Sequence, residues 1–430
     1  MTGVTNFPVT SALGLLWVMP FLGLLLSIAL LPTLAGTHWV RRHAEWTLFW
    51  TLSFLLPAAF LRGAGPIGAV LAGTVLHDYL PFILLLTSLY VVTGGIHIAG
   101  TPRAEAWLNT TLLFVGIVLA GIVGTLAASL LLVRPLIRIN RHRRWRAHLL
   151  VFFIVLVANV GGALSPSGNP PLLIGYLEGV PFLWPLEHLF LPTLVLGAGL
   201  LVTFFVVDRH LMRGEPRAQA DGATKIRVSG LINLPVLAGI IVAEIAAPEY
   251  AADALYVVFA ALSLFLTPRH IRRANDFAWG PIAEVAILFA GIFVTLIPAI
   301  GAIASGPPGP AAPLFATLMQ GDVPNNLMFF TATGVLSAIL DNAPTYLIFF
   351  DFAGGDAARL TGAAATTLAA ISAGAAYFGA LTYIGNAPNL VVKSVAEARG
   401  VRMPGFFAFT GLAVLIAGPW YALVALLFFR

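Results

Sequence analysis

The chain has 430 residues, of which 59% are hydrophobic and 10% are charged. Soluble domains carry about 25% charged residues, so the composition excludes an ordinary soluble protein and predicts one that lies in lipid. The net charge of +5 would suit nucleic acid or a membrane surface. Because the basic residues lie in short loops between apolar runs, we expect a lipid bilayer and no nucleic acid as partner. The lack of cysteine excludes disulfides and thiolate metal sites.

A membrane-spanning helix needs roughly 20 mostly apolar residues, and the first half of the chain supplies several such runs. The pattern predicts spans at 11–34, 46–62, 77–98 and 186–207. Two further stretches are interrupted by small, polar or proline residues. They are 106–137, which is divided near Gly121, Gly124 and Thr125, and 147–178, which is predicted to be a broken helix. Residues 1–208 form the first predicted repeat.

A polar, basic linker, expected in the cytoplasm, is predicted at 209–228, and the second half then repeats the order of the first. Its spans are predicted at 229–248, 252–268, 278–302 and 405–429. Its interrupted stretches are 323–352, with a break near Asp341, and the broken helix 362–398. Residues 229–430 form the second predicted repeat. The predicted fold class is therefore an all-α polytopic membrane protein built from two repeats.

A ten-residue segment occurs in both broken helices, at an offset of 217 residues. Residues 162–171 read GALSPSGNPP and residues 379–388 read GALTYIGNAP, which agree at six positions. Inside a bilayer, backbone that leaves a helix must line a cavity or meet a ligand, and paired interruptions in two halves mark a transporter binding site. A repeat that serves packing alone is the alternative, but it does not explain why Asn169 and Asn386 both recur.

The basic residues decide whether the divided stretches cross the membrane. If the N-terminus is outside and both stretches enter and leave by one side, most of the 23 Lys and Arg residues fall in cytoplasmic loops, as the positive-inside rule requires. Each half then has five spans plus one re-entrant helical hairpin. Since five is odd, the two repeats have inverted topology, and both termini are predicted outside.

The hairpin breaks and the broken helices are predicted to form two copies of one site at the bilayer midplane. Thr125 precedes Asn169 by 44 residues, and Asn342 precedes Asn386 by the same interval. We therefore expect each asparagine to approach the hairpin tip of its own half. Hydroxyl, amide and carboxylate oxygens suit a hard cation such as sodium, whereas helix N-termini suit an anion. The candidate ion-binding residues are Thr125, Ser129, Ser165, Ser167, Asn169, Asp341, Asn342, Thr345, Thr382, Asn386 and Asn389.

Carboxylates inside predicted spans are the candidate proton carriers, because ionisable groups in a membrane are costly and mark function. Asp341 is the first candidate, since it lies at a break in a repeat, and Glu284 is the second, with a structural pair as its alternative role. Desolvation disfavours the charged form of Asp341, which sodium would favour. A coupling sodium ion is expected at Asp341, Asn342 and Asn386. Arg134, inside the first hairpin, either reaches the cytoplasmic interface or meets an anionic substrate.

Other classes of protein fit the sequence less well. No HExxH, GxSxG, phosphate-loop or GxGxxG pattern stands where a fold could use it, so we expect no enzyme and no cofactor. Ser165 and Ser167 could mimic an intramembrane serine protease, but that chemistry needs a base and leaves the repeated asparagines unexplained. A passive ion channel is a stronger rival. The repeated hairpins and the asymmetric carboxylate favour coupled transport over it.

Three segments resemble the ion transporter superfamily, which includes arsenite permeases, citrate transporters, sodium-coupled dicarboxylate transporters and one group of sodium/proton antiporters. LDNAPTYL resembles the aspartate–asparagine hairpin of the arsenite and sodium/proton branches. GTLAASLLLVRPLIR and YIGNAPNLVVKSVAEARGVRMPGFF are similar to bacterial sodium/proton antiporters with a citrate-transporter-like domain. The resemblance covers nearly the whole chain. It implies a scaffold and a moving region that work by an elevator-like motion, with ion sites at Thr125 and Ser129, Ser165 to Asn169, Asp341 to Thr345, and Thr382 to Asn389.

One departure from the resembled proteins concerns Asn169, where they tend to carry aspartate. Asp341 is then the sole acid in the four motif segments, which weakens the case for a second cation site. We expect a secondary transporter of the bacterial inner membrane that exchanges sodium for protons. Cation-coupled transport of a small anion, such as citrate, another carboxylate or arsenite, is the alternative. A homodimer is among the expected assemblies.

Overall fold

The computed structural model describes residue 7 and residues 12–35, 37–100, 104–213, 227–305, 309–310, 312–320 and 323–430. Its first half contains η2 (Ala12–Val18), α1 (Met19–Ala35), α2 (Thr37–Arg62), α3 (Ala64–Gly73), η3 (Thr74–Tyr79), α4 (Leu80–Gly94), β1 (His97–Ala99), α5 (Ala106–Val123), α6 (Thr125–Ile139), α7 (Ala147–Leu156), η4 (Val160–Leu164), α8 (Pro170–Leu177) and α9 (Trp184–Met212). The elements η2 and η4 are 3-10 helices, and η3 is a π-helix.

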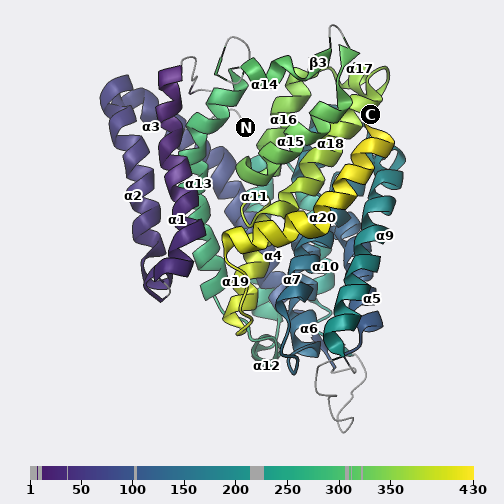
Figure 1. Ribbon diagram of the computed structural model, residues 1–430. Helices are drawn as coiled ribbons and strands as arrows, with labels where there is room; N and C mark the ends of the chain where they lie inside the picture. Colours follow the sequence, from purple (N-terminus) through teal and green to yellow (C-terminus); the bar gives the residue numbers. More distant parts are fainter. Residues whose placement is uncertain are drawn as a thin grey trace.

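The second half follows the same order of helices with different lengths (Figure 1). It contains β2 (Arg227–Ser229), α10 (Asn233–Ala246), α11 (Glu249–Leu266), α12 (Arg269–Ala274), α13 (Gly280–Ala304), α14 (Ala312–Ala316), β3 (Met319–Gln320), β4 (Val323–Pro324), α15 (Asn326–Leu340), α16 (Asn342–Phe352), α17 (Ala357–Thr361), α18 (Ala365–Phe378), the 3-10 helix η5 (Gly379–Leu381), α19 (Ala387–Ala398) and α20 (Phe406–Phe428).

Apolar helices of membrane-spanning length run through the described part of the chain, where seven are long and apolar enough to cross a bilayer. Large apolar side chains on their outer faces, such as Phe60 and Phe265, are 88% exposed in the isolated molecule. Such surface is stable only in lipid. The prediction of an α-helical, multi-pass membrane protein is confirmed. The strands add only two short antiparallel pairs in loops, β1 with β2 and β3 with β4.

The third predicted span differs from the observed helix. The sequence placed it at 77–98, but a continuous helix runs from Ala64 to Gly94 and contains α3, η3 and α4. Residues 64–73 lie outside the spans predicted from the sequence. They nevertheless continue the helix, because no proline or polar break separates them from Thr74. The π-helical turn lies in the middle of this helix, and such turns occur frequently at functional sites.

The predicted linker, 209–228, falls mostly outside the described residues. Its first residues, up to Met212, continue α9, and Arg227 already belongs to β2. The boundaries of the two predicted repeats therefore remain predictions.

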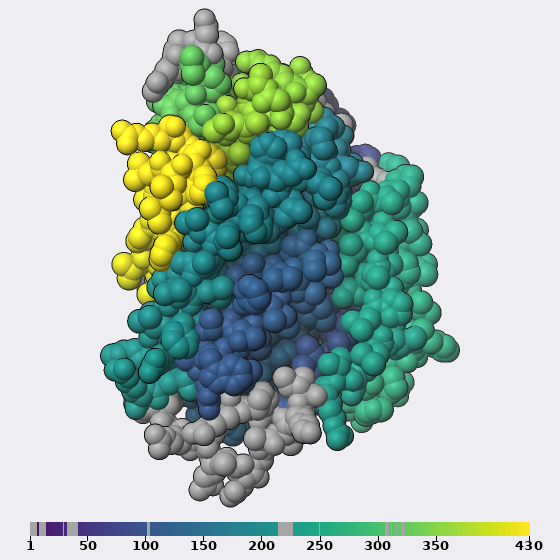
Figure 2. Space-filling view, turned by 90° about the vertical axis from the view of Figure 1, so that its right-hand side faces the viewer, coloured from purple at the N-terminus to yellow at the C-terminus, as the bar shows by residue number. Residues whose placement is uncertain are grey.

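The helices form two groups. One group contains α1, α2, α3, α4, α10, α11 and α13, which contact one another in pairs. The other contains α5 to α9 and α15 to α20. In Figure 1, α1, α2 and α13 lie on the left, while α9 and α20 lie on the right. Figure 2 shows α9 crossing beside α5, with α10 and α11 on the far right. The groups meet where α4 contacts α6 and α13 contacts α19.

Contacts between helices recur when the two halves are exchanged. Helix α6 packs against α19, and α16 packs against α8. In the same way, α4 packs against α11, and α13 packs against α2. Each hairpin therefore rests on the second part of the broken helix from the other half. This exchange decides which side chains meet at the centre of the molecule.

Candidate functional site

Two one-residue joints connect the helices of the interrupted stretches. Gly124 joins α5 to α6 with φ 89° and ψ 148°, and Asp341 joins α15 to α16 with φ 77° and ψ 149°. The joints are 217 residues apart and share one backbone conformation. Glycine adopts this region freely, whereas other residues are strained there. The second joint therefore places an aspartate in a conformation suited to glycine.

The contacts of Asp341 explain how the strain is tolerated. Its carboxylate accepts a hydrogen bond from the backbone N–H of Asn342 at 2.7 Å, and its carbonyl accepts one from the Thr345 hydroxyl at 2.7 Å. The carboxylate thereby caps the N-terminus of α16. These two bonds fix the tip of the hairpin.

Replacing Asp341 with glycine should stabilise the protein. Relief of strain is worth about 1–3 kcal/mol. The loss of one hydrogen bond costs about 1 kcal/mol, and the flexibility of glycine in the unfolded chain costs about 0.5–1 kcal/mol. Removal of a desolvated carboxylate adds to the gain. We expect Asp341→Gly to raise the thermal midpoint in detergent and Gly124→Asp to lower it. A lower midpoint for Asp341→Gly would show that the cap outweighs the strain.

Glycine pairs hold the two broken helices in matching shapes. A Cβ atom at Gly162 would collide with the carbonyl oxygen of Gly168, and one at Gly379 would collide with that of Gly385. In both halves the loop therefore folds back on the end of the preceding helix, and its backbone passes closer than any side chain would allow. This explains why both glycines recur in the ten-residue segment.

Hydroxyl groups tie each loop to the hairpin of its own half. Ser165 Oγ donates to the Gly121 carbonyl at 2.5 Å, and Thr382 Oγ1 donates to the Ala338 carbonyl at 2.5 Å. All four positions are related by the offset of 217 residues. Ser167 Oγ lies 3.2 Å from Ser165 Oγ and extends the first group. The serine and threonine of the repeated segment thus have the same structural role in both halves.

The repeated asparagines reach across to the opposite half. Asn342 Nδ2 donates to Asn169 Oδ1 at 2.9 Å. Asn386 Nδ2 donates to the Ala158 carbonyl at 2.9 Å and to Asn159 Oδ1 at 3.0 Å. The side-chain bonds of both asparagines therefore cross between the halves, and among the described residues no hydrogen bond joins Asn386 to Asn342. Helix α16 packs on α8, which brings Asn342 to Asn169 of the first broken helix.

The first hairpin tip keeps part of the expected pairing. The backbone N–H of Thr125 donates to the carbonyl of Gly168 at 3.0 Å. Gly168 directly precedes Asn169, so the first tip contacts the loop that carries this asparagine. Thr125 also lines a cavity of about 70 Å³ together with Asn386. The first tip is therefore bonded to its own loop and shares a cavity with Asn386, whereas the second tip is bonded to Asn169 of the other half.

A buried amide network holds the second loop and was missed in the sequence. Asn159 Nδ2 donates to Asn389 Oδ1 at 2.8 Å, and Asn389 Nδ2 donates to the carbonyls of Gly379 and Thr382. The sequence feature that could have indicated this network is Asn159, an amide inside the apolar run that precedes the repeated segment. It went unnoticed because Ala376, the corresponding residue of the second half, is apolar.

Acidic side chains that were not selected from the sequence also face the hairpin tips. Asp78, in the π-helical turn, lines a cavity of about 40 Å³ together with Asp341. Glu244 lines the cavity of Thr125 and Asn386. Asp78 is buried, whereas the predicted third span, 77–98, placed it at the start of a helix. The longer helix explains the difference, since Asp78 lies at its centre.

The expected sodium ligands are not gathered in one place. Asp341 and Asn386 line different cavities. Within the described residues, the buried Asn342 Oδ1, Asn169 Nδ2 and Ser129 Oγ have no hydrogen-bond partner. Unsatisfied polar atoms inside a protein are rare and call for a ligand or water. Asn342 and Asn169 are joined by a hydrogen bond, and Asp341 directly precedes Asn342, so these three residues form the polar centre that is the candidate site.

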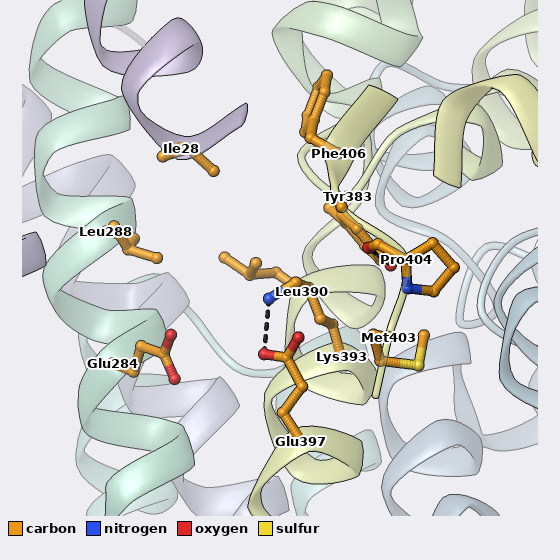
Figure 3. Close-up of a pocket in the computed structure, with 11 residues that line it drawn as sticks. Ile28, Glu284, Leu288, Tyr383, Leu390, Lys393, Glu397, Met403, Pro404 and Phe406 are labelled. Carbon is orange, nitrogen blue, oxygen red and sulfur yellow. Dashed lines mark hydrogen bonds and ion pairs between the residues drawn. The ribbon is translucent and has the colours of Figure 1, made fainter. Parts of the chain in front are cut away.

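Arg134 and Glu284 lie away from this centre. Arg134 is 2% exposed, and its guanidinium lies over the Tyr90 ring at 5.1 Å. It does not reach the surface, so the interfacial role is wrong. Its Nη2 has no hydrogen-bond partner among the described residues. Glu284 Oε2 accepts from Ser394 Oγ at 2.8 Å across the two helix groups, in the cavity of Figure 3.

A comparison with protein-family models identifies the class of protein. One model, described as “Putative citrate transport”, matches residues 10–429. The chain belongs to this citrate-transport family. No curated protein matches it. In this member of the citrate-transport family, the described residues contain no group of three or more metal-ligating side chains. The oxygen groups that line the cavity at the second tip include the carboxylates of Asp341 and Asp78, and those at the first tip include the Thr125 hydroxyl, the Asn386 amide and the Glu244 carboxylate.

Proposed function

We propose that this protein is a secondary transporter that exchanges sodium for protons across the inner membrane of a bacterium. Asp341 carries the proposal. It is the only acid in the four motif segments, it occupies a strained joint, and it lines a small cavity between the two helix groups. Desolvation disfavours its charged form, while sodium favours it. One group can then bind either ion and exchange them by competition.

The arrangement of the helices supports an elevator-like movement. Helices α4 and α13 belong to the group without breaks, and they contact α6 and α19 of the group that carries both hairpins. We propose that the first group is the scaffold and that the second moves against it. Both hairpin tips would then travel with the ion, and the two repeats would give alternating access from inside and outside.

The proposed inverted topology predicts opposite sides for two exposed positions in a chain without cysteine. His142, after the first hairpin, should face the cytoplasm, and Ala358, after the second, should face outside; both are exposed. We expect His142→Cys to react with a membrane-impermeant thiol reagent only in inside-out vesicles. Ala358→Cys should react only in right-side-out vesicles. Labelling of both from one side would rule out inverted hairpins.

The transport reaction is tested in proteoliposomes under imposed gradients. Sodium/proton exchange predicts that a sodium gradient drives proton movement when no organic anion is present. Citrate and arsenite are added separately as challengers. Dissipation of each gradient without coupling would identify a passive channel instead. Movement of citrate or arsenite that requires a cation gradient would identify anion transport.

Anion transport is the second candidate, and two observations favour it. The family description names citrate, and Arg134 is a buried cation in the first hairpin with one nitrogen free of hydrogen bonds among the described residues. Arginine binds carboxylates through paired hydrogen bonds. If citrate is the substrate, Arg134→Lys should strongly reduce cation-driven citrate movement in proteoliposomes, because lysine cannot form the paired hydrogen bonds.

A further inference from the structure

A polar cavity lies between the proposed scaffold and the proposed moving region. It measures about 180 Å³ and separates α13 from α19. In Figure 3, Glu284 and Leu288 point from α13 into this space, and Lys393 and Glu397 lie on the α19 side. Tyr383, in the loop of the second broken helix, lines the same cavity. We call this space the vestibule.

The vestibule adjoins the cavity that holds Asp341. Leu288 lines the vestibule, and the next residue, Phe289, lines the Asp341 cavity. On the opposite wall, Tyr383 lines the vestibule and Ile384 lines the Asp341 cavity. Successive residues on a helix rise by only about 1.5 Å, so the two spaces follow each other along α13. Leu288 is 2% exposed and Tyr383 is 1% exposed, so both side chains are buried on opposite walls of the vestibule, at the end where it adjoins the Asp341 cavity.

The charges of the vestibule favour a cation. Lys393 Nζ pairs with Glu397 Oε2 at 2.7 Å, and Lys393 also lies over the Tyr383 ring. Glu284 accepts its hydrogen bond from the neutral Ser394, and no ion pair to a described residue offsets its charge. The vestibule therefore carries one carboxylate in excess. A cleft with excess charge of one sign concentrates ions of the opposite sign.

The far wall of the Asp341 cavity also carries an acid. Asp78 lies there on the long helix of the scaffold group, in the π-helical turn. The cavity of about 40 Å³ exceeds the 10–15 Å³ that one water molecule needs. It can therefore hold a small hydrated or partly dehydrated cation between the two walls.

We propose that a monovalent cation reaches Asp341 through the vestibule, past a gate formed by Leu288 and Tyr383, with Asp78 as the acid of the opposite wall. Glu284 is then a positioning residue that gathers cations at the entrance, and it is not itself the proton carrier. This inference rests on the proposed binding of a cation at Asp341. It adds the route by which the cation arrives and the residues that close it.

Thiol labelling tests the route without requiring any particular transport activity. In the cysteine-free chain, Leu288→Cys should react with a small cationic methanethiosulfonate reagent applied from the side that labels His142→Cys. Reaction should slow when sodium is raised. Ile287→Cys is the matched control, since Ile287 is 37% exposed and does not line the vestibule. Lipid excludes a charged reagent, so this cysteine should stay unreactive from both sides. If Leu288→Cys stays unreactive from both sides, or reacts at a rate independent of sodium, the route is wrong.

Transport measurements then distinguish the route from the proposed function. Leu288→Trp should block most sodium-driven proton movement, whereas Ile287→Trp should not. Glu284→Gln should raise the apparent KM for sodium by about three- to tenfold at low salt, leave the maximal rate unchanged, and lose this effect at high salt. Equal transport by Leu288→Trp and wild type would overturn the route. If wild type shows no sodium/proton exchange, the proposed function fails, and the labelling of Leu288→Cys still decides the route.

Discussion

Asp341→Asn should abolish coupled exchange of sodium for protons while the protein still inserts and folds. Asparagine tolerates positive φ better than most residues, and its side-chain oxygen can still accept the bond from the Asn342 N–H that Asp341 accepts at 2.7 Å. The amide cannot carry a proton or a charge at neutral pH. No other carboxylate in the motif segments can replace it. Proton movement in proteoliposomes under a sodium gradient measures the loss.

Asp351→Asn is the matched control, because Asp351 is an exposed acid on the same helix, α16. It should transport as wild type does. Equal thermal midpoints of the three proteins would show that folding is not the cause of the loss. If Asp341→Asn keeps coupled transport, the proton carrier lies elsewhere. Glu284 would then be the next candidate, and anion transport would become the leading function.

Arg143→Met should cause the largest loss of stability among the substitutions considered. Arg143 Nη1 lies 2.7 Å from Asp208 Oδ1, and Asp208 is fully buried. His148 and Asn109 bond the same carboxylate at 2.8 and 2.9 Å. Removing one partner of a buried ion pair costs about 3–5 kcal/mol, because the remaining charge is buried without compensation. The thermal midpoint in detergent should fall by several degrees.

The control for this substitution is Arg141→Met. Arg141 is exposed two residues away, so its removal should change the midpoint little, as is usual for surface charges. A similar, small effect of both substitutions would show that water reaches Asp208. The prediction matters for the transporter as a whole, since Asn109 on α5 and Asn140 after α6 also bond in this network. The base of the first hairpin depends on it.

The sequence located the parts of the site but not their partners. The repeated segment and its constant spacing placed the breaks near Gly124 and Asp341, where the structure has the joints. Hydrophobicity and helix-breaking residues are local properties, so a single chain reveals them. The bond between Asn342 and Asn169 depends on α16 packing against α8. The sequence of neither helix indicates that these two helices pack together.

The acids Asp78 and Glu244 illustrate the second limit. Each lies near the end of an apolar run, where a solvated or interfacial place is the usual reading. Asp78 lies in the interior because its helix begins at Ala64, 13 residues before the predicted start at residue 77. Glu244 faces the first tip because α10 packs against α4. Helix length and helix packing, rather than residue type, decided both positions.

The matching joints at Gly124 and Asp341 give the chain an internal comparison. Both have a backbone shape that glycine adopts without cost, yet one carries glycine and the other an acid. The unstrained joint can therefore serve as a reference for the strained one within the same molecule. Exchanging the two residues in one molecule, Gly124→Asp with Asp341→Gly, would show whether the acid can work from the opposite entrance.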